Sequence, residues 1–171
     1  MNYISTRDKS IKVSAAKAIA QGISDEGGLF VPIIGEKVDA HKFIAQVFDN
    51  GADAVFMSHG DVIDPEKAHI LVKDTVKALG DLGTYYRKKF AMPLVGITGS
   101  VGKTSTKEII SSVLSTKYNV LKTLGNFNNE IGVPLTLFRL REEHEIAVIE
   151  MGINHFEEMH RLSDIARPNV S

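Results

Sequence analysis

A glycine-rich turn between a strand pattern and a helix pattern constrains this sequence most. Residues 94–98 are LVGIT, residues 99–103 are GSVGK, and a helical pattern follows over residues 104–117. A strand that leads into a helix N-terminus can aim successive backbone N–H groups at one anion. Glycine permits the positive φ and the close approach of backbone that such a turn requires. The pattern therefore predicts a phosphate-binding loop in an α/β fold.

The side chains of this loop have predicted roles in holding a nucleotide. Lys103 would bridge two phosphate groups as a point charge, and the Thr104 hydroxyl would ligate Mg²⁺. The strict pattern G-x-x-x-x-G-K-[ST] would need glycine at Ile97, so a glycine-rich turn with a surface lysine is the alternative. The residues predicted to bind nucleotide are Gly99, Ser100, Val101, Gly102, Lys103, Thr104 and Ser105.

A nucleotide loop of this kind usually works with an acidic residue at the end of a buried strand. Glu150 ends the apolar run 146–149 and is followed by Met-Gly. A carboxylate in that place is dry and fixed, which suits it to hold a metal ion beside the phosphates. Glu150 is therefore predicted to be a catalytic residue with Lys103 and a magnesium ligand with Thr104. A structural or solvated glutamate is the alternative.

Polar side chains that could orient a substrate form two further groups. Asn126, Asn128 and Asn129 lie between a strand pattern and a helix pattern and supply amide donors and acceptors. His155 follows the strand that ends at Glu150. All four are predicted to border the substrate, although asparagines also populate ordinary turns and a lone histidine is often structural.

Composition limits the classes of function. Among 171 residues, 20 are Lys or Arg and 21 are Asp or Glu, giving a formal net charge of -1. This balance disfavours a general nucleic-acid partner, so any anion site must be local. Cysteine is absent, which excludes disulfides and thiolate metal sites. Because no apolar run approaches the ~20 residues of a membrane span, we expect a cytoplasmic protein without membrane insertion.

Apolar runs alternate with helical patterns, which predicts an α/β fold with a mostly parallel sheet. Met92-Pro93 ends a helix over 75–90, and we place a domain boundary there. Arg87, Lys88 and Lys89 are expected to form a solvated face at the end of that helix. The helix over 104–117 is expected to bury four apolar side chains. These are Ile109, Ile110, Val113 and Leu114.

Three ordered motifs together resemble the Mur ligases. They are GSVGKTSTKE at 99–108, the stretch 123–134, and Glu-Met-Gly at 150–152. The variant glycine loop is the usual form in that family. Residues 28–52 further resemble the family's UDP-substrate domain, so the resemblance covers about residues 28–171. It implies a small α/β substrate domain over 28–91 and an incomplete nucleotide-loop central domain over 92–171.

The first part of the chain resembles a different family. Residues 3–7, 13–22 and 25–32 are similar to the N-terminus of threonine synthase, a pyridoxal-phosphate enzyme. We therefore interpret the chain as a chimera with a junction at 28–32, in which residues 1–32 form a threonine-synthase-like segment. Ser5-Thr6-Arg7 could mimic a uridine-binding motif of the ligases, but a helix expected over 14–20 separates it from Gly28. Nothing after residue 32 resembles the lysine or phosphate loop of threonine synthase.

The Mur resemblance implies ATP-dependent amide synthesis in peptidoglycan precursor formation. D-Alanyl-D-alanine would be added to a UDP-linked muramoyl-tripeptide through an acyl phosphate, with ATP and Mg²⁺. The family's second metal-site histidine, modified lysine and closing C-terminal domain are not among these residues, so we expect no turnover by this chain alone. The alternatives are a Mg-ATP-binding module without turnover and, with less support, an enzyme related to threonine synthase.

Overall fold

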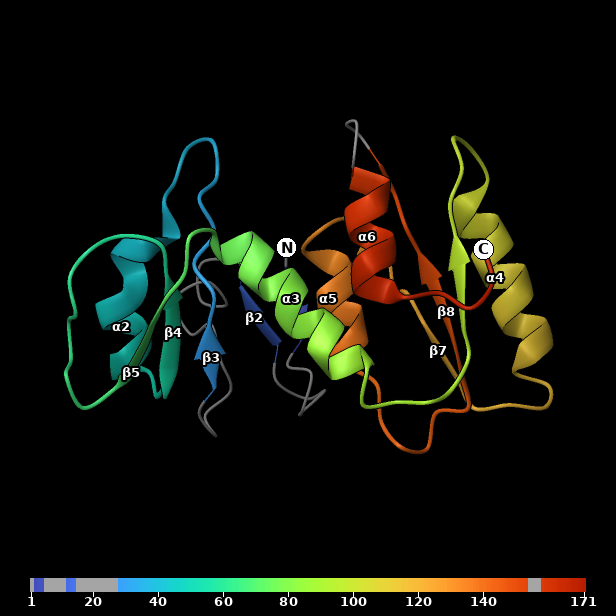
Figure 1. Ribbon diagram of the computed structural model, residues 1–171, viewed down its shortest axis with the longest axis horizontal. Coiled ribbons are helices and arrows are strands. Elements are labelled where there is room, and N and C mark those ends of the chain that lie inside the picture. Colours follow the sequence, from blue (N-terminus) through green and yellow to red (C-terminus); the bar gives the residue numbers. More distant parts are fainter. Residues whose placement is uncertain (1, 5–11, 15–27, 154–157) are drawn as a thin grey trace. The chain divides into compact units, whose positions relative to one another are not determined.

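The computed structural model describes residues 2–4, 12–14, 28–153 and 158–171. It divides into two compact units, Met1–Ala78 and Leu79–Ser171 (Figure 1). The division falls within helix α3, Thr75–Arg87, whereas the sequence pattern placed a boundary at Met92. The later half of α3 packs in the second unit, because Gly80 lies against Ile165 and Gly83 against Pro134.

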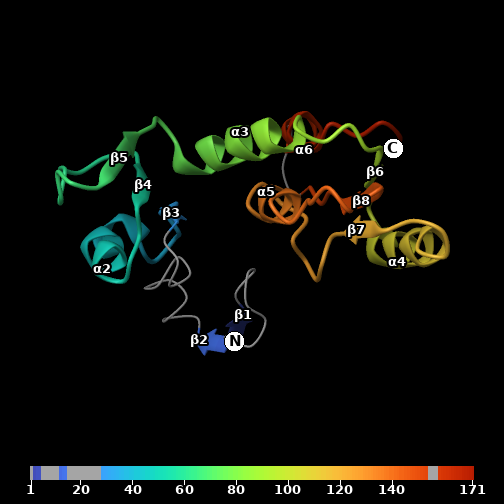
Figure 2. The same cartoon turned by 90° about the horizontal axis from the view of Figure 1, so that it is seen from below.

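The first unit contains two small sheets. Strands β1 (Asn2–Ile4) and β2 (Lys12–Ser14) pair antiparallel, and strands β3 (Leu29–Phe30), β4 (Ala54–Met57) and β5 (Ala68–Leu71) form a parallel sheet in that order. A 3₁₀ turn η1 (Ala40–Phe43) leads into helix α2 (Ile44–Asp49), and both follow β3 in the chain (Figure 2). Most of the helix predicted over 14–20, and the motif at 5–7, lie outside the described residues.

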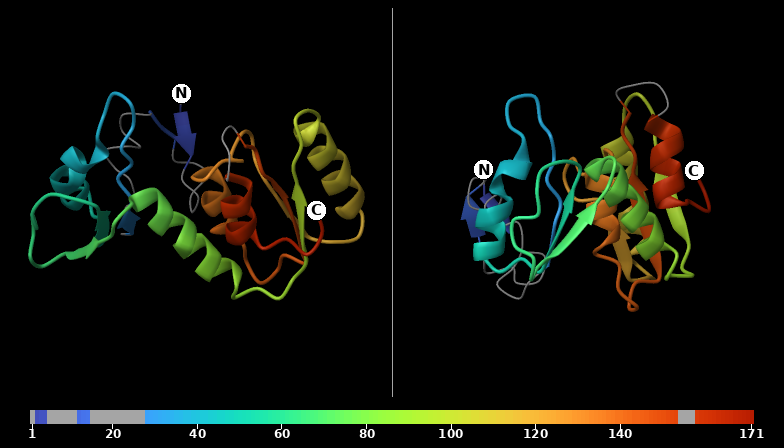
Figure 3. Two further views of the ribbon diagram at one scale, coloured as in Figure 1. Left: turned by 45° about the horizontal axis from the view of Figure 1, so that its top comes forward. Right: turned by 60° about the vertical axis from the view of Figure 1, so that its left-hand side comes forward.

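The second unit is a parallel sheet in the order β6-β8-β7. Its strands are β6 (Leu94–Ile97), β7 (Val120–Lys122) and β8 (Ile146–Glu150). Besides the later half of α3, its helices are α4 (Lys103–Leu114), α5 (Gly132–Leu137) and α6 (Glu158–Ala166). Helix α4 lies on one side of the sheet, with α5 and α6 on the other (Figures 1 and 3). The expected α/β class with parallel sheets is confirmed.

The two faces of this sheet are buried differently. The apolar core lies under α5 and α6, where Leu137 and Leu162 are fully buried against the sheet. Under α4, by contrast, the fully buried helix residues are Lys107 and Ser111. The face of α4 that carries these two polar residues is therefore the one turned toward the sheet.

The expected apolar face of α4 is therefore partly wrong. Ile109 and Val113 are each 65% exposed, while Ile110 and Leu114 are half-buried. The two exposed residues are four positions apart and share one helix face, which points away from the sheet. The hydrophobic spacing predicted that these residues lie on the helix surface at regular intervals, but it did not predict which face of the helix packs against the sheet.

A pair of substitutions tests this assignment of faces. Leu162→Ala in α6 is expected to lower the free energy of unfolding by about 2–5 kcal/mol, because it leaves a cavity at a fully buried site. Ile109→Ala in α4 is expected to change it by less than about 0.5 kcal/mol. Urea denaturation followed by circular dichroism measures both. Equal losses for the two variants would contradict the assignment.

Candidate nucleotide-binding site

The carboxyl ends of β6 and β8 lie side by side. The parallel register pairs Ile97 with Glu150, and the Met151 N–H donates to the Ile97 carbonyl over 2.8 Å. The loop that follows β6 therefore starts beside the Glu150 carboxylate, although the two lie far apart in the sequence. Ligands of open parallel sheets bind at this end of the strands.

The loop has the backbone conformation expected of its glycines. Gly99 has φ 142° and Gly102 has φ 75°, both in the region that favours glycine. The Lys103 ammonium folds back across the loop and donates to the Gly99 carbonyl over 2.7 Å. Among the described residues, no backbone or side-chain acceptor takes up the N–H groups of 99–102. These donors remain available to an anion at the start of α4.

Two hydrogen-bond donors and one cation surround the carboxylate of Glu150, a residue that is only 2% exposed. The Thr104 hydroxyl lies 3.2 Å from Oε1 and 3.1 Å from Oε2, and the Asn128 amide donates to Oε1 over 2.9 Å. The cation is the Lys107 ammonium, which forms an ion pair with the carboxylate at 3.5 Å from Oε2. The fold thus brings Thr104 and Glu150, the two predicted magnesium ligands, into direct contact.

Sequence reasoning missed Lys107. The side chain is 1% exposed, and its Nζ also lies 3.2 Å from Glu108 Oε1. Glu108 in turn pairs with Lys122, and this hydrogen bond is the main cause of a lowered pKa for the Glu108 carboxyl. The sequence signal that could have identified it is its spacing. Lys107 lies three positions after Thr104 and therefore on the same helix face.

Two further residues hold the end of β8 in place. The Glu150 N–H donates to the hydroxyl of fully buried Thr123 over 2.9 Å, which ties β8 to the end of β7. At Gly152, a β-carbon would lie 2.9 Å from the Asn128 amide nitrogen. Glycine at this position therefore leaves the space through which Asn128 reaches Glu150.

The predicted substrate-binding asparagines have different surroundings. Asn128 alone of the three contacts Glu150. The Asn129 side chain accepts the N–H groups of Ile131 and Gly132 at the start of α5, and the Asn126 carbonyl accepts the Asn128 N–H. Each of these last contacts is typical of a turn. His155 lies outside the described residues.

The donor set at this end of the sheet suits magnesium. Mg²⁺ prefers oxygen ligands, usually one or two from protein, with water and substrate phosphates completing its shell. The Thr104 hydroxyl and the Glu150 carboxylate are such ligands and lie next to the free N–H groups of the loop. The residues present therefore fit a magnesium ion bound together with a nucleotide.

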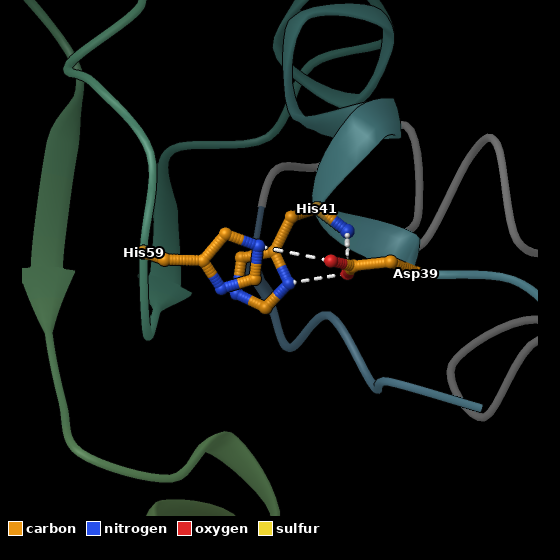
Figure 4. A group of neighbouring side chains, drawn as sticks. All are labelled: Asp39, His41 and His59. Atoms are coloured by element: carbon orange, nitrogen blue, oxygen red, sulfur yellow. Dashed lines mark hydrogen bonds and ion pairs between the residues drawn. The ribbon is translucent and has the colours of Figure 1, made fainter. Parts of the chain in front are cut away.

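The first unit holds a separate cluster of Asp39, His41 and His59 (Figure 4). Asp39 Oδ1 lies 2.6 Å from His41 Nδ1, and Oδ2 lies 2.9 Å from His59 Nε2. Hydrogen bonds from the His41 backbone and side chain hold the pKa of the Asp39 carboxyl below its ordinary value. Two imidazoles and a carboxylate are also a donor set that zinc accepts.

The hydrogen bonds of His41 favour a structural role for this cluster over metal binding. Its Nε2 accepts the Ser58 N–H over 3.0 Å, so the proton of a neutral ring lies on Nδ1 and is donated to Asp39. Both ring nitrogens are then used, and neither offers a free lone pair. The cluster ties the turn at residues 39–41 to the segment that follows β4.

An open cavity of about 670 Å³ lies near the start of β6, and its lining includes Arg87, Lys88 and Arg167. Arg87 is not part of a solvated face, because it is 6% exposed and donates to the carbonyls of residues 90, 92 and 166. The expectation was wrong for Arg87, while Lys88 and Lys89 are exposed. Arg87 joins α3 to the end of α6, and the cavity lies away from the glycine-rich loop at residues 99–103.

Comparison with known families gives two matches. A model of the Mur ligase middle domain matches residues 97–171. A model of the threonine synthase N terminus matches residues 2–59. In the described part of the chain, no helix is long and apolar enough to cross a membrane.

Curated relatives and solved structures extend the first match. The chain is 45% identical over 144 residues to a UDP-N-acetylmuramoyl-tripeptide–D-alanyl-D-alanine ligase of Bacillus subtilis and 43% identical over 145 residues to one of Escherichia coli. These alignments cover 84% and 85% of the chain and 32% of each relative. The chain therefore spans about a third of the length of these relatives.

Crystal structures of proteins that are similar to this chain in sequence also share its fold. MurF from Acinetobacter baumannii has a TM-score of 0.78 and 44% identity, covering 84% of this chain and 31% of that one. A MurF ligase from Thermotoga maritima, solved in complex with ADP, has a TM-score of 0.79 and 36% identity, covering 87% of this chain and 34% of that one.

Proposed function

We propose that this chain, which belongs to the Mur ligase family, forms the substrate-domain and nucleotide-loop part of an ATP-dependent ligase. The whole enzyme would join D-alanyl-D-alanine to UDP-N-acetylmuramoyl-tripeptide, the reaction that its relatives' names describe. The small-molecule partners are then ATP and a UDP-linked peptide. A cytoplasmic location is part of the proposal.

The observation that carries the proposal is the contact between Thr104 and Glu150. These residues lie 46 positions apart and meet at 3.1 Å beside a loop of free N–H groups. A glycine-rich turn with a surface lysine would not require a buried carboxylate at this point. An arrangement that holds Mg-ATP requires both the loop and an oxygen ligand next to it.

The chain's own residues have distinct roles in this proposal. The backbone N–H groups of the loop bind the phosphates, and Lys103 swings from the Gly99 carbonyl onto the phosphoryl group that is transferred. Bound magnesium would supply charge neutralisation for that group, with Thr104 and Glu150 as its protein ligands. Asn128 orients Glu150, and the residues around it exclude water from the carboxylate.

The chemistry explains why a nucleotide is needed. A carboxylate is a poor electrophile, so one of its oxygens would first take the γ-phosphoryl group of ATP, which breaks the bond to the β-phosphate, releases ADP and forms an acyl phosphate. An amine would then attack the carbonyl carbon and lose a proton, so that the new amide bond forms and phosphate leaves with the electron pair of the broken C–O bond. Positioning and electrostatic stabilisation are the contributions expected of the protein.

Calorimetric titration with ATP in excess Mg²⁺ tests the proposal. Saturable binding is expected, together with no phosphate release when the UDP-linked tripeptide and D-alanyl-D-alanine are added, because these 171 residues span a third of the relatives. Binding without turnover is also what a Mg-ATP-binding module would show, and turnover after fusion to the remaining two thirds of a relative would separate the two. A folded chain that binds no nucleotide would overturn the proposal.

A further inference from the structure

Lys107 is a buried cation that has no role in the proposed function. Its side chain is 1% exposed, so its ammonium cannot reach a nucleotide held above the loop. A lysine seldom lies this deep in a protein without a paired charge, because removing its ammonium from water is unfavourable. The groups that Lys107 contacts must therefore compensate for its burial.

Those groups form a line of alternating charges that ends at Glu150. Lys122, half-buried on β7, pairs with Glu108, Glu108 pairs with Lys107, and Lys107 Nζ lies 3.5 Å from Glu150 Oε2. Among the described residues, Lys107 is the sole cation within 4 Å of the Glu150 carboxylate. Thr104 and Asn128 contact that carboxylate as neutral donors.

The contacts divide between the two carboxylate oxygens. Asn128 donates to Oε1, Lys107 lies against Oε2, and the Thr104 hydroxyl is within reach of both. With one oxygen held by an amide and the other by an ammonium, the carboxylate cannot rotate freely about its terminal bond. Its remaining lone pairs then have fixed directions.

We propose that Lys107 is a positioning residue for Glu150, whose buried ammonium fixes the carboxylate at the end of β8 in the orientation that receives magnesium. The inference rests on the proposed function, because it gives Glu150 the role of a metal ligand. Lys107 acts through Glu150 and touches neither phosphate nor metal.

Nucleotide binding with and without metal provides the test. Lys107→Met keeps the length of the side chain and removes its charge. We expect about a tenfold loss of affinity for ATP in excess Mg²⁺ and less than a twofold change for ATP in EDTA. Lys117→Met is the matched control, since Lys117 is an exposed lysine beyond the end of α4 and outside this line of charges, and both of its affinities should stay within twofold of the unmodified chain.

A double variant shows whether Lys107 acts through Glu150. In a Glu150→Gln background, Lys107→Met should change neither affinity further. Equal losses with and without Mg²⁺, or a further loss in the Glu150→Gln background, would mean a general packing role and would overturn the inference. If the unmodified chain binds no Mg-ATP, the proposed function fails instead, so the two failures are distinguishable.

Thermal unfolding without nucleotide keeps the inference testable if Lys107→Met folds poorly. Breaking a buried ion pair from one side leaves an uncompensated charge, whereas replacing both partners by neutral groups is often tolerated. We therefore expect a lower melting temperature for each single variant and partial recovery in Lys107→Met with Glu150→Gln. A double variant that melts no higher than Lys107→Met, or that also fails to fold, would contradict coupling between the two residues.

Discussion

Lys103→Ala is expected to weaken binding of ATP about 100-fold, whether or not Mg²⁺ is present. The Lys103 ammonium lies at the start of α4 and reaches across the glycine-rich loop to the Gly99 carbonyl. A hydrogen bond to a charged group contributes about 1.5–3 kcal/mol, and about 2.8 kcal/mol corresponds to a 100-fold change in affinity. Isothermal titration calorimetry with ATP, in Mg²⁺ and then in EDTA, measures both affinities.

Folding must remain intact for this result to bear on the site. Lys103 is half-buried and bonds a carbonyl within its own loop, so its truncation should leave the melting temperature within a few degrees of the unmodified chain. Lys117→Ala is the matched control, because Lys117 is an exposed lysine just beyond the far end of the same helix. A Lys103→Ala variant that binds ATP like this control would show that the loop does not hold phosphate.

Glu150→Gln is expected to remove the Mg²⁺-dependent part of ATP binding. Glutamine keeps the shape of the side chain but loses the anionic oxygen that Mg²⁺ prefers. The affinity in excess Mg²⁺ should fall at least about tenfold, toward the value in EDTA, while the value in EDTA stays within about twofold. Lys103→Ala lowers both affinities, so the pattern of losses distinguishes a metal ligand from a phosphate ligand.

The same substitution should also lower stability. It leaves Lys107 buried with Glu108 as its remaining anionic partner, and we expect a loss of about 1–3 kcal/mol in the free energy of unfolding. Glu142→Gln is the control, since it makes the same change at an exposed site away from the loop. An unchanged Mg²⁺ dependence in a folded Glu150→Gln variant would rule out Glu150 as a metal ligand.

Short-range sequence patterns were sufficient to predict much of the local structure of the second unit. The apolar run 146–149 followed by an acidic residue predicted a buried strand ending at Glu150, and β8 has these bounds. The glycines of the loop also have the positive φ that the turn pattern required. Both features depend on neighbours in the chain, namely strand hydrophobicity and the conformational freedom of glycine.

Helix faces and charge burial were less accessible to sequence reasoning. Ile109 and Val113 were expected in the core but are exposed, whereas Lys107 and Arg87 are buried. A periodic pattern gives the spacing of a stripe, but the direction of that stripe depends on the loop that starts the helix and on the acceptors it meets. Arg87 is buried because carbonyls at the end of α6 and after α3 accept its guanidinium.

The sequence by itself determined the α/β class, the glycine turn between strand and helix, and the acidic strand end, because each follows from local pattern and backbone preference. Only the tertiary structure decided which side chains meet there. The parallel register of β6 with β8 places Glu150 beside the loop, and the turn after β7 brings Asn128 to it. Contacts between residues 22 and 46 positions apart depend on strand order, which no local pattern specifies.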